Sequence, residues 1–239
     1  MKLNIYPCVS GSCLKMIAIT TMLIDHIGYH ILRFMPEGHR ILYTLGHRTV
    51  TLYDLSRGVG RMAFPIFAFL IVEGYLHTRD RMRYGRNLLL FAFISEIPWN
   101  LVYSNSLFHP TKQNVFFTLF LGFLAICAAD RLRTDFKRQA VCLLSILAVS
   151  FLLRADYGCG GLGFILMLYV LREERIWKAV IGTCFLPSTW RAGLAFIPIS
   201  LYNGQRGFVR GRWLKYAFYI FYPAHLFVLY LLKLHLFAT

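Results

Sequence analysis

Long apolar stretches, separated by short polar and basic segments, recur along the whole chain. The first, Leu14 to Met35, is long enough to cross a bilayer, because about 20 residues of α-helix span the hydrocarbon core. Five more stretches are predicted as spans: residues 61–78, 84–103, 114–130, 139–153 and 216–237. Three shorter segments predict short, tilted spans or re-entrant hairpins: residues 162–171, 176–187 and 190–202. The pattern predicts an all-α, polytopic integral membrane helix bundle with about 8–10 transmembrane or re-entrant helices.

The connections between these stretches are short, so residues 1–239 are predicted to form a single transmembrane domain. Residues 36–60 are interpreted as a polar loop with room for a short helix, and residues 154–163 as a glycine-rich re-entrant turn. Pro98 is expected to kink its helix just past Glu96, because proline lacks an N–H and frees a backbone carbonyl.

Composition agrees with this class: 57% of the 239 residues are hydrophobic, and no segment is left for a soluble domain. The net charge of +15 would suggest nucleic acid in a soluble protein. Here the basic residues lie in the short connections, where topology and anionic membrane lipids explain them, and we expect no nucleic-acid partner. The six cysteines include no CxxC pair, so neither a zinc site nor a disulfide framework is indicated.

The distribution of Lys and Arg predicts the orientation. If the N-terminus is cytoplasmic and the chain crosses nine times, the inner segments carry 17 of these residues and the outer ones 9. Positive residues concentrate on the cytoplasmic side of membrane proteins. The sequence therefore favours a cytoplasmic N-terminus and an outer C-terminus.

The most informative polar residues are Asp25 and His26, at the middle of the first span. An ionisable side chain at that depth is costly, by roughly 2.5 to 3.5 kcal/mol on insertion scales, so such residues usually face protein or water. On a helix Asp25 shares a face with Tyr29, and His26 shares the next with His30. The alternative is a polar seam that holds this helix in the bundle.

Other ionisable residues are predicted inside the membrane as well. They are Glu73 and His77 on the second span, Glu96 on the third and His225 on the last. We expect these side chains to line one cavity with Asp25 and His26. No metal site is predicted, because HExxH is missing and Glu73 with His77 supplies only two ligands.

Histidine suits general-base chemistry near neutral pH, and a carboxylate can orient it. Asp25 cannot easily orient its neighbour His26, because consecutive helix residues point about 100° apart. We therefore expect Asp25 to pair with a residue on another helix; Tyr222, His225 and Arg61 are the candidates.

Five blocks of the sequence, in this order, resemble the TraX family. They are LKMIAITTMLIDHIG, GRMAFPIFAFLIVEGYLHTRDRMRYGRNLLLFAFISEIPWNL, NVFFTL, DYGCGGLG and YIFYPAHL. The family consists of multi-span bacterial membrane proteins, and its named member acetylates the N-terminus of conjugative pilin. The family is also similar in character to membrane acyltransferases that transfer an acetyl group from cytosolic coenzyme A.

The resemblance implies an acetyltransferase of the bacterial cytoplasmic (inner) membrane with acetyl-CoA as donor. The acceptor is an amine or hydroxyl of a pilin N-terminus, another peptide, a sugar or a small molecule. His26 fits the base, and His225 or Tyr222 would polarise the carbonyl. The predicted catalytic set is His26, Asp25, His225, Tyr222 and Glu73.

The binding residues that the resemblance implies fall into two sets. Coenzyme A phosphates would meet Arg61, Arg79, Arg81, Arg83 and Arg86, although topology alone also explains these arginines. The acceptor would meet Glu96, His77, Asn114, Asp156 and Tyr157, with helix capping as the alternative for Asp156 and Tyr157.

Two other functions fit the same residues. A proton-coupled transporter would use Asp25, Glu73 and Glu96 to carry protons or cations, since charged residues at mid-membrane serve that purpose too. A non-catalytic assembly protein would use none of them chemically.

Overall fold

The computed structural model describes residues 7–46, 48–185, 190–209 and 211–237. It is helical almost throughout, which confirms the prediction of an all-α fold. Two helical stretches are long and apolar enough to cross a membrane: Leu52–His77, with 26 residues, and Trp213–Phe237, with 25. The chain forms two compact units, residues 1–67 with 183–239 and residues 68–182. The interpretation of residues 1–239 as one transmembrane domain stays a prediction.

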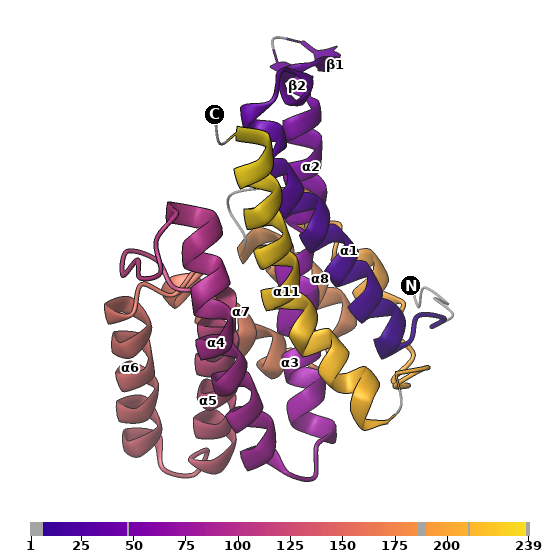
Figure 1. Cartoon of the computed structure of the whole chain (residues 1–239). Helices are drawn as coiled ribbons and strands as arrows, with labels where there is room; N and C mark the ends of the chain where they lie inside the picture. The colour runs from indigo at the N-terminus through magenta and orange to yellow at the C-terminus, as the bar shows by residue number, and fades with distance from the viewer. Residues whose placement is uncertain (1–6, 47, 186–189, 210, 238–239) are drawn as a thin grey trace. The chain divides into compact units, whose positions relative to one another are not determined.

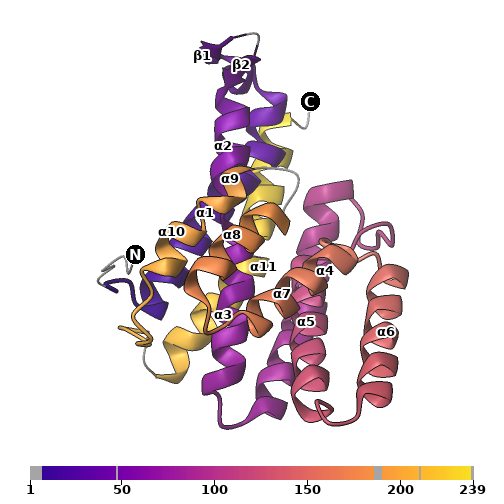
Figure 2. The ribbon, with the colours of Figure 1, turned by 180° about the vertical axis from the view of Figure 1, so that it is seen from behind.

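The first unit is built on three helices that pack side by side: α1 (Gly11–His30), α2 (Leu52–Gly60) and α11 (Arg212–Phe237) (Figures 1 and 2). Ser10 caps α1, because its side chain accepts a hydrogen bond from the Cys13 N–H. Two short helices, α9 (Trp190–Gly193) and α10 (Phe196–Ser200), complete this unit.

The segment predicted as a polar loop, residues 36–60, is mostly regular structure. After the short 3-10 helices η1 (Leu32–Phe34) and η2 (Pro36–His39), the chain forms an antiparallel hairpin of β1 (Ile41–Leu45) and β2 (Arg48–Thr51). Helix α2 follows at once. Thr51 and Asp54 start it with a capping box, in which each side chain accepts a hydrogen bond from the other residue's N–H.

Helices α1 and α2 approach closely because small residues lie between them. A Cβ added at Gly28 would overlap Ser56, and one added at Gly60 would overlap Asp25. Membrane helices commonly pack through such small residues. The two glycines therefore set the distance at which side chains of α2 meet Asp25.

The second unit holds most of α3 (Ala63–His77) together with α4 to α7 and the start of α8. These helices are α4 (Arg81–Ser104), α5 (Val115–Arg131), α6 (Phe136–Leu152), α7 (Gly158–Val170) and α8 (Arg175–Phe185). Helix α5 lies at the centre and packs against α4, α6 and α7 (Figures 1 and 2). Fully buried apolar side chains such as Phe164 and Ile126 form its core.

The segment 190–202, predicted as a short, tilted span or a re-entrant hairpin, contains two short helices, α9 and α10, separated by residues 194–195. Two details of the sequence interpretation were wrong. The glycines of residues 154–163 do not form a turn throughout, because α7 already begins at Gly158. The first helix ends at His30 rather than Met35, because the chain there continues into 3-10 turns.

Candidate active site

Two histidines from opposite ends of the sequence meet in the first unit. The Nδ1 of His26, on α1, lies 2.7 Å from the Nε2 of His225, on α11. Their rings are nearly parallel, with centroids 5.0 Å apart and 7° between the planes. His225 is buried, with 6% of its surface exposed, and His26 is half-buried. The sequence predicted both as catalytic residues, and the fold brings them into direct contact.

The hydrogen bonds around the pair assign its protons. The Nδ1 of His225 lies 2.9 Å from the Phe221 carbonyl oxygen, which can only accept, so this nitrogen carries a proton. In a neutral imidazole the other nitrogen is then an acceptor, and it accepts from the Nδ1–H of His26. The Nε2 of His26 therefore keeps a lone pair, and it has no hydrogen-bond partner among the residues that the structure describes. This is the arrangement of a general base with an acceptor behind it.

Aromatic side chains surround the two histidines. The Tyr222 ring, also on α11, lies edge-on to both, with centroids 6.3 Å from His26 and 5.5 Å from His225. His30, one turn along α1, lies 6.0 Å from His26 between ring centroids. Tyr222 and His30 are both buried. Tyr222 is thus a direct neighbour of the histidine pair, as its predicted role in polarising the carbonyl requires.

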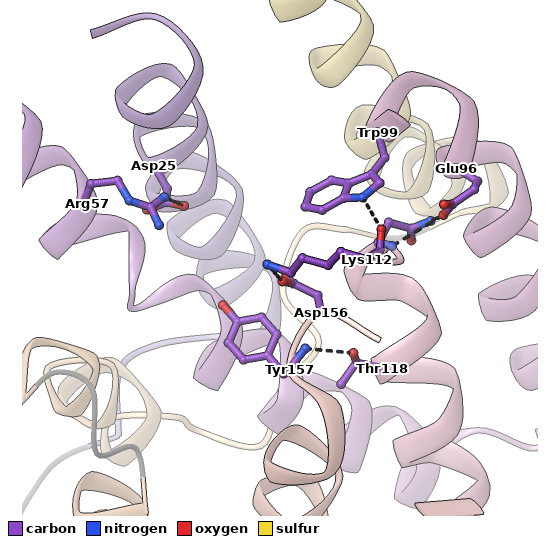
Figure 3. Close-up of polar contacts among 9 residues, drawn as sticks. Asp25, Arg57, Glu96, Trp99, Lys112, Thr118, Asp156 and Tyr157 are labelled. Atoms are coloured by element: carbon purple, nitrogen blue, oxygen red, sulfur yellow. Dashed lines mark hydrogen bonds and ion pairs between the residues drawn. The ribbon is translucent and has the colours of Figure 1, made fainter. Parts of the chain in front are cut away.

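Asp25 forms an ion pair with Arg57 on α2, with 2.5 Å between its Oδ2 and the guanidinium Nη1 (Figure 3). We expected a partner on another helix, but named Tyr222, His225 and Arg61. The partner is an arginine one turn before Arg61, and its guanidinium carbon lies 4.9 Å from the centre of the Tyr29 ring. The sequence did not predict Arg57 as the partner, because residues 36–60 were interpreted as a loop. No helical face was therefore assigned to Arg57.

Glu73 and His77 interact within one helix of the second unit. The Nδ1 of His77 lies 2.9 Å from the Glu73 carbonyl oxygen and 3.6 Å from its carboxylate. The side chain of His77 is 64% exposed. That these two residues and Glu96 share a cavity with His26 stays a prediction.

The predicted phosphate-binding arginines differ in their surroundings. Arg81 pairs with Asp130 at 3.2 Å, and its guanidinium carbon lies 4.0 Å from the Tyr75 ring centre. The same carboxylate accepts hydrogen bonds from the hydroxyls of Tyr75, at 2.6 Å, and Tyr169, at 3.0 Å. Arg81 is therefore held in a structural cluster.

Of the other arginines of this group, Arg61 is half-buried, and three are exposed: Arg79, Arg83 and Arg86. Arg83 lies 3.9 Å from Asp80, a loose surface pair. None of these contacts identifies a phosphate site.

A second group of predicted residues meets in the second unit. Glu96 accepts a 2.6 Å hydrogen bond from the Nδ2 of Asn114, which caps α5 (Figure 3). Asp156 forms an ion pair with Lys112, with 2.5 Å between Oδ1 and Nζ. Asp156 thus does not cap a helix with its side chain. The N–H of Tyr157 lies 3.4 Å from the Thr118 hydroxyl, to which it donates.

A basic cluster that the sequence analysis missed lies in the first unit. Lys15, on α1, has Arg206 and Lys215 as its neighbouring cations. Arg206 is held in place because Ser12 donates both its N–H, at 2.9 Å, and its hydroxyl, at 2.6 Å, to the Arg206 carbonyl oxygen. Lys15 comes eleven residues before His26, which is three helical turns and about 16 Å along the same face. No spacing signal marks this cluster, because Arg206 comes from a distant loop.

In the part of the chain that the structure describes, no group of three or more His, Cys, Asp or Glu side chains is placed to hold a metal ion.

Comparison with known proteins adds two findings. A family model described as "TraX protein" matches residues 10–233. A protein of Dichelobacter nodosus named "Probable fimbrial assembly protein FimC, serogroup H1" is 30% identical over 252 aligned residues, covering 93% of this chain and 95% of that protein. No solved structure matches. The chain belongs to the TraX family.

Proposed function

We propose that this protein is an integral membrane acetyltransferase that moves an acetyl group from acetyl-CoA to an amine, with His26 as the general base. The observation that carries the proposal is the hydrogen bond between His26 and His225. It leaves one basic nitrogen, Nε2 of His26, directed away from its partner.

Acetyl-CoA would supply an activated thioester carbonyl, and the chain's residues would handle the proton. His26 Nε2 takes a proton from the attacking amine as the nitrogen–carbon bond forms and the carbon–sulfur bond breaks. His26 becomes an imidazolium. His225 stabilises this cation, because the Nε2 of His225 accepts a hydrogen bond from the Nδ1–H of His26. The proton then leaves with the thiol of coenzyme A, so the histidine pair returns to its starting state.

The cluster of Lys15, Arg206 and Lys215 fits the phosphates of the donor better than Arg81 does. It belongs to the same unit as the histidine pair, and Lys15 lies about 16 Å from His26 along α1. Cationic side chains are the usual ligands of phosphate groups. A donor held there by its phosphates would extend an acyl group along α1 toward His26.

The proposed location is the bacterial cytoplasmic membrane, crossed several times, with the N-terminus in the cytoplasm. The start of α1, which carries Lys15, then lies on the side where coenzyme A is found. A relative named as a fimbrial assembly protein supports a role in pilus assembly, and the N-terminal amine of a pilin subunit is the acceptor that we propose.

The test is transfer of labelled acetyl groups from acetyl-CoA to a peptide with the N-terminal sequence of a pilin subunit, with the protein in detergent or lipid nanodiscs. Replacing a general base typically costs a factor of 10² to 10⁴, so His26→Ala is expected to lose at least about a hundredfold in kcat. The matched control is His235→Ala, an exposed histidine near the end of α11. Equal turnover by the wild type and His26→Ala would refute the base. No turnover by the wild type, together with substrate accumulation in vesicles, would indicate a transporter.

A further inference from the structure

Three cationic side chains gather at the C-terminal end of α1. Arg33 follows α1 in η1, Arg57 lies on α2, and Lys233 lies near the end of α11, which reaches the same end of the first unit (Figure 1). Arg33 and Arg57 lie over the ring of Tyr29, with their guanidinium carbons 5.4 and 4.9 Å from its centre. The guanidinium carbon of Arg33 and the Nζ of Lys233 lie 5.9 and 5.5 Å from the centre of the Phe34 ring. The two shared rings therefore hold three positive charges in one cluster.

This cation cluster carries more positive than negative charge. Asp25 neutralises one of its members through the ion pair with Arg57. Arg33 forms no ion pair with any carboxylate that the structure describes. Side chains of one sign that are held together raise the local concentration of ions of the other sign. The cluster is therefore suited to bind an anion.

Membrane topology does not explain the arginines of this region. In the predicted orientation residues 33–61 lie outside, yet they carry five arginines, more Lys and Arg than the other outer segments together. Positive residues are expected on the cytoplasmic side instead. These arginines therefore need another explanation, and recognition of an anion is the one that the arrangement of Arg33 and Arg57 supports.

The cation cluster lies next to the histidine pair. The ring centre of His30 is 6.0 Å from that of His26. The charges of Arg57 and Lys233 lie close enough to His30 to influence it. Arg33 comes seven residues after His26, which is about two helical turns on the same face and about 10 Å along the axis. An anionic group bound in the cluster can thus belong to a molecule whose reacting group lies at His26.

We propose that Arg33, Arg57 and Lys233 bind an acidic side chain on the third or fourth residue of an acceptor peptide. An extended peptide advances about 3.3–3.6 Å per residue, so about 10 Å corresponds to three residues. With the terminal amine at His26, a carboxylate on the third or fourth residue lies beside the cations. It would accept hydrogen bonds from the guanidinium of Arg33. This inference rests on the proposed function, because it takes His26 as the point of acetyl transfer.

The test measures the binding of three eight-residue peptides to the purified protein in a neutral detergent, by calorimetry and without an acetyl donor. The peptides have a free N-terminal amine and a C-terminal amide. They differ only in whether glutamate stands at position 3, at position 7 or nowhere, with glutamine in its place. We expect the peptide with glutamate at position 3 to bind at least about fivefold more tightly than either of the others.

The two acidic peptides have the same net charge, so a general attraction to this basic protein cannot produce the expected difference between them. Equal binding of these two peptides, or binding of none of the three, would overturn the proposal.

The diagnostic variants are Arg33→Gln and Lys233→Gln, which each remove one charge and leave the ion pair of Asp25 with Arg57 in place. Each is expected to reduce the preference for glutamate at position 3 by about threefold or more. The matched control is Arg138→Gln, which removes a charge from a side chain that is 79% exposed on α6, and it is expected to bind like the wild type. Full preference in both diagnostic variants would refute the site.

The competing occupant of the cluster is the headgroup of an anionic lipid. Thermal unfolding is therefore measured with phosphatidylglycerol or phosphatidylcholine added to the detergent. Stabilisation by phosphatidylglycerol alone that Arg33→Gln abolishes, together with equal binding of the three peptides, would overturn the proposal in favour of a lipid.

The binding result can be separated from the proposed acetyl transfer, because no donor is present. Transfer to all three peptides at equal rates, with equal binding, would refute the acidic-residue site and leave the transferase standing. Tighter binding of the peptide with glutamate at position 3, without turnover of any peptide, would refute the transferase and support the anion site.

Discussion

The ion pair between Asp25 and Arg57 gives the sharpest prediction for the stability of the first unit. Its side chains are 18% and 22% exposed, so the pair lies between a solvated surface pair and a buried one. Exposed pairs contribute about 0–1 kcal/mol, and breaking a buried pair costs about 3–5 kcal/mol. We therefore expect a coupling free energy of about 2 kcal/mol between the two side chains.

A double-mutant cycle measures this coupling. Asp25→Ala, Arg57→Ala and the double variant are unfolded by titrating SDS into mixed micelles, and the free energy of unfolding is followed by circular dichroism. Arg57→Ala also loses its packing on Tyr29, but the cycle cancels that contribution.

The matched control is the pair of Asp80 and Arg83, which is 59% and 63% exposed with 3.9 Å between the charged atoms. Its coupling is expected to stay below about 1 kcal/mol. A second cycle between Asp25 and Arg61 should give a coupling near zero, because Asp25 pairs with Arg57 instead. If Arg61 couples to Asp25 as strongly as Arg57 does, the assignment of the partner is wrong.

Two further substitutions test the packing of each unit. Gly60→Ala is expected to destabilise the first unit by about 1–3 kcal/mol, because the new methyl group overlaps Asp25, whereas Gly11→Ala, whose methyl group makes only ordinary contacts, should not. Thermal unfolding of both variants decides this, and equal melting temperatures would contradict the close packing. Tyr75→Phe removes a 2.6 Å hydrogen bond to the carboxylate of Asp130 and is expected to cost about 1.5–3 kcal/mol in the second unit. Hydrogen exchange of its amides is the measurement, and unchanged protection would show that the bond contributes little.

The pattern of apolar and polar positions predicted most helices of this protein from the sequence alone. Helices α4, α5 and α6 begin and end within a few residues of the predicted spans, because each is a long apolar run bounded by polar or basic residues. The sequence also singled out His26 and His225, since ionisable side chains within apolar runs are rare enough to draw attention.

Where the pattern was weak, the interpretation of the sequence failed. The hairpin of β1 and β2 and helix α2 lie in a polar segment without a long apolar run, and Arg57 was overlooked with them. The segment after residue 154 is rich in glycine, which usually marks a turn, but packing of α7 against α5 keeps it helical from Gly158 onward.

Sequence alone determined the helical class of the protein and drew attention to His26 and His225, because helix formation and membrane insertion depend on the local order of apolar and polar residues. Only the tertiary structure decided the partners of those residues. His26 and His225 are 199 residues apart, and Lys15 and Arg206, whose charges lie close enough to influence each other, are nearly as far apart in the chain. Such contacts depend on how helices pack against one another, and helix packing is set by side chains distant in the chain rather than by any local pattern.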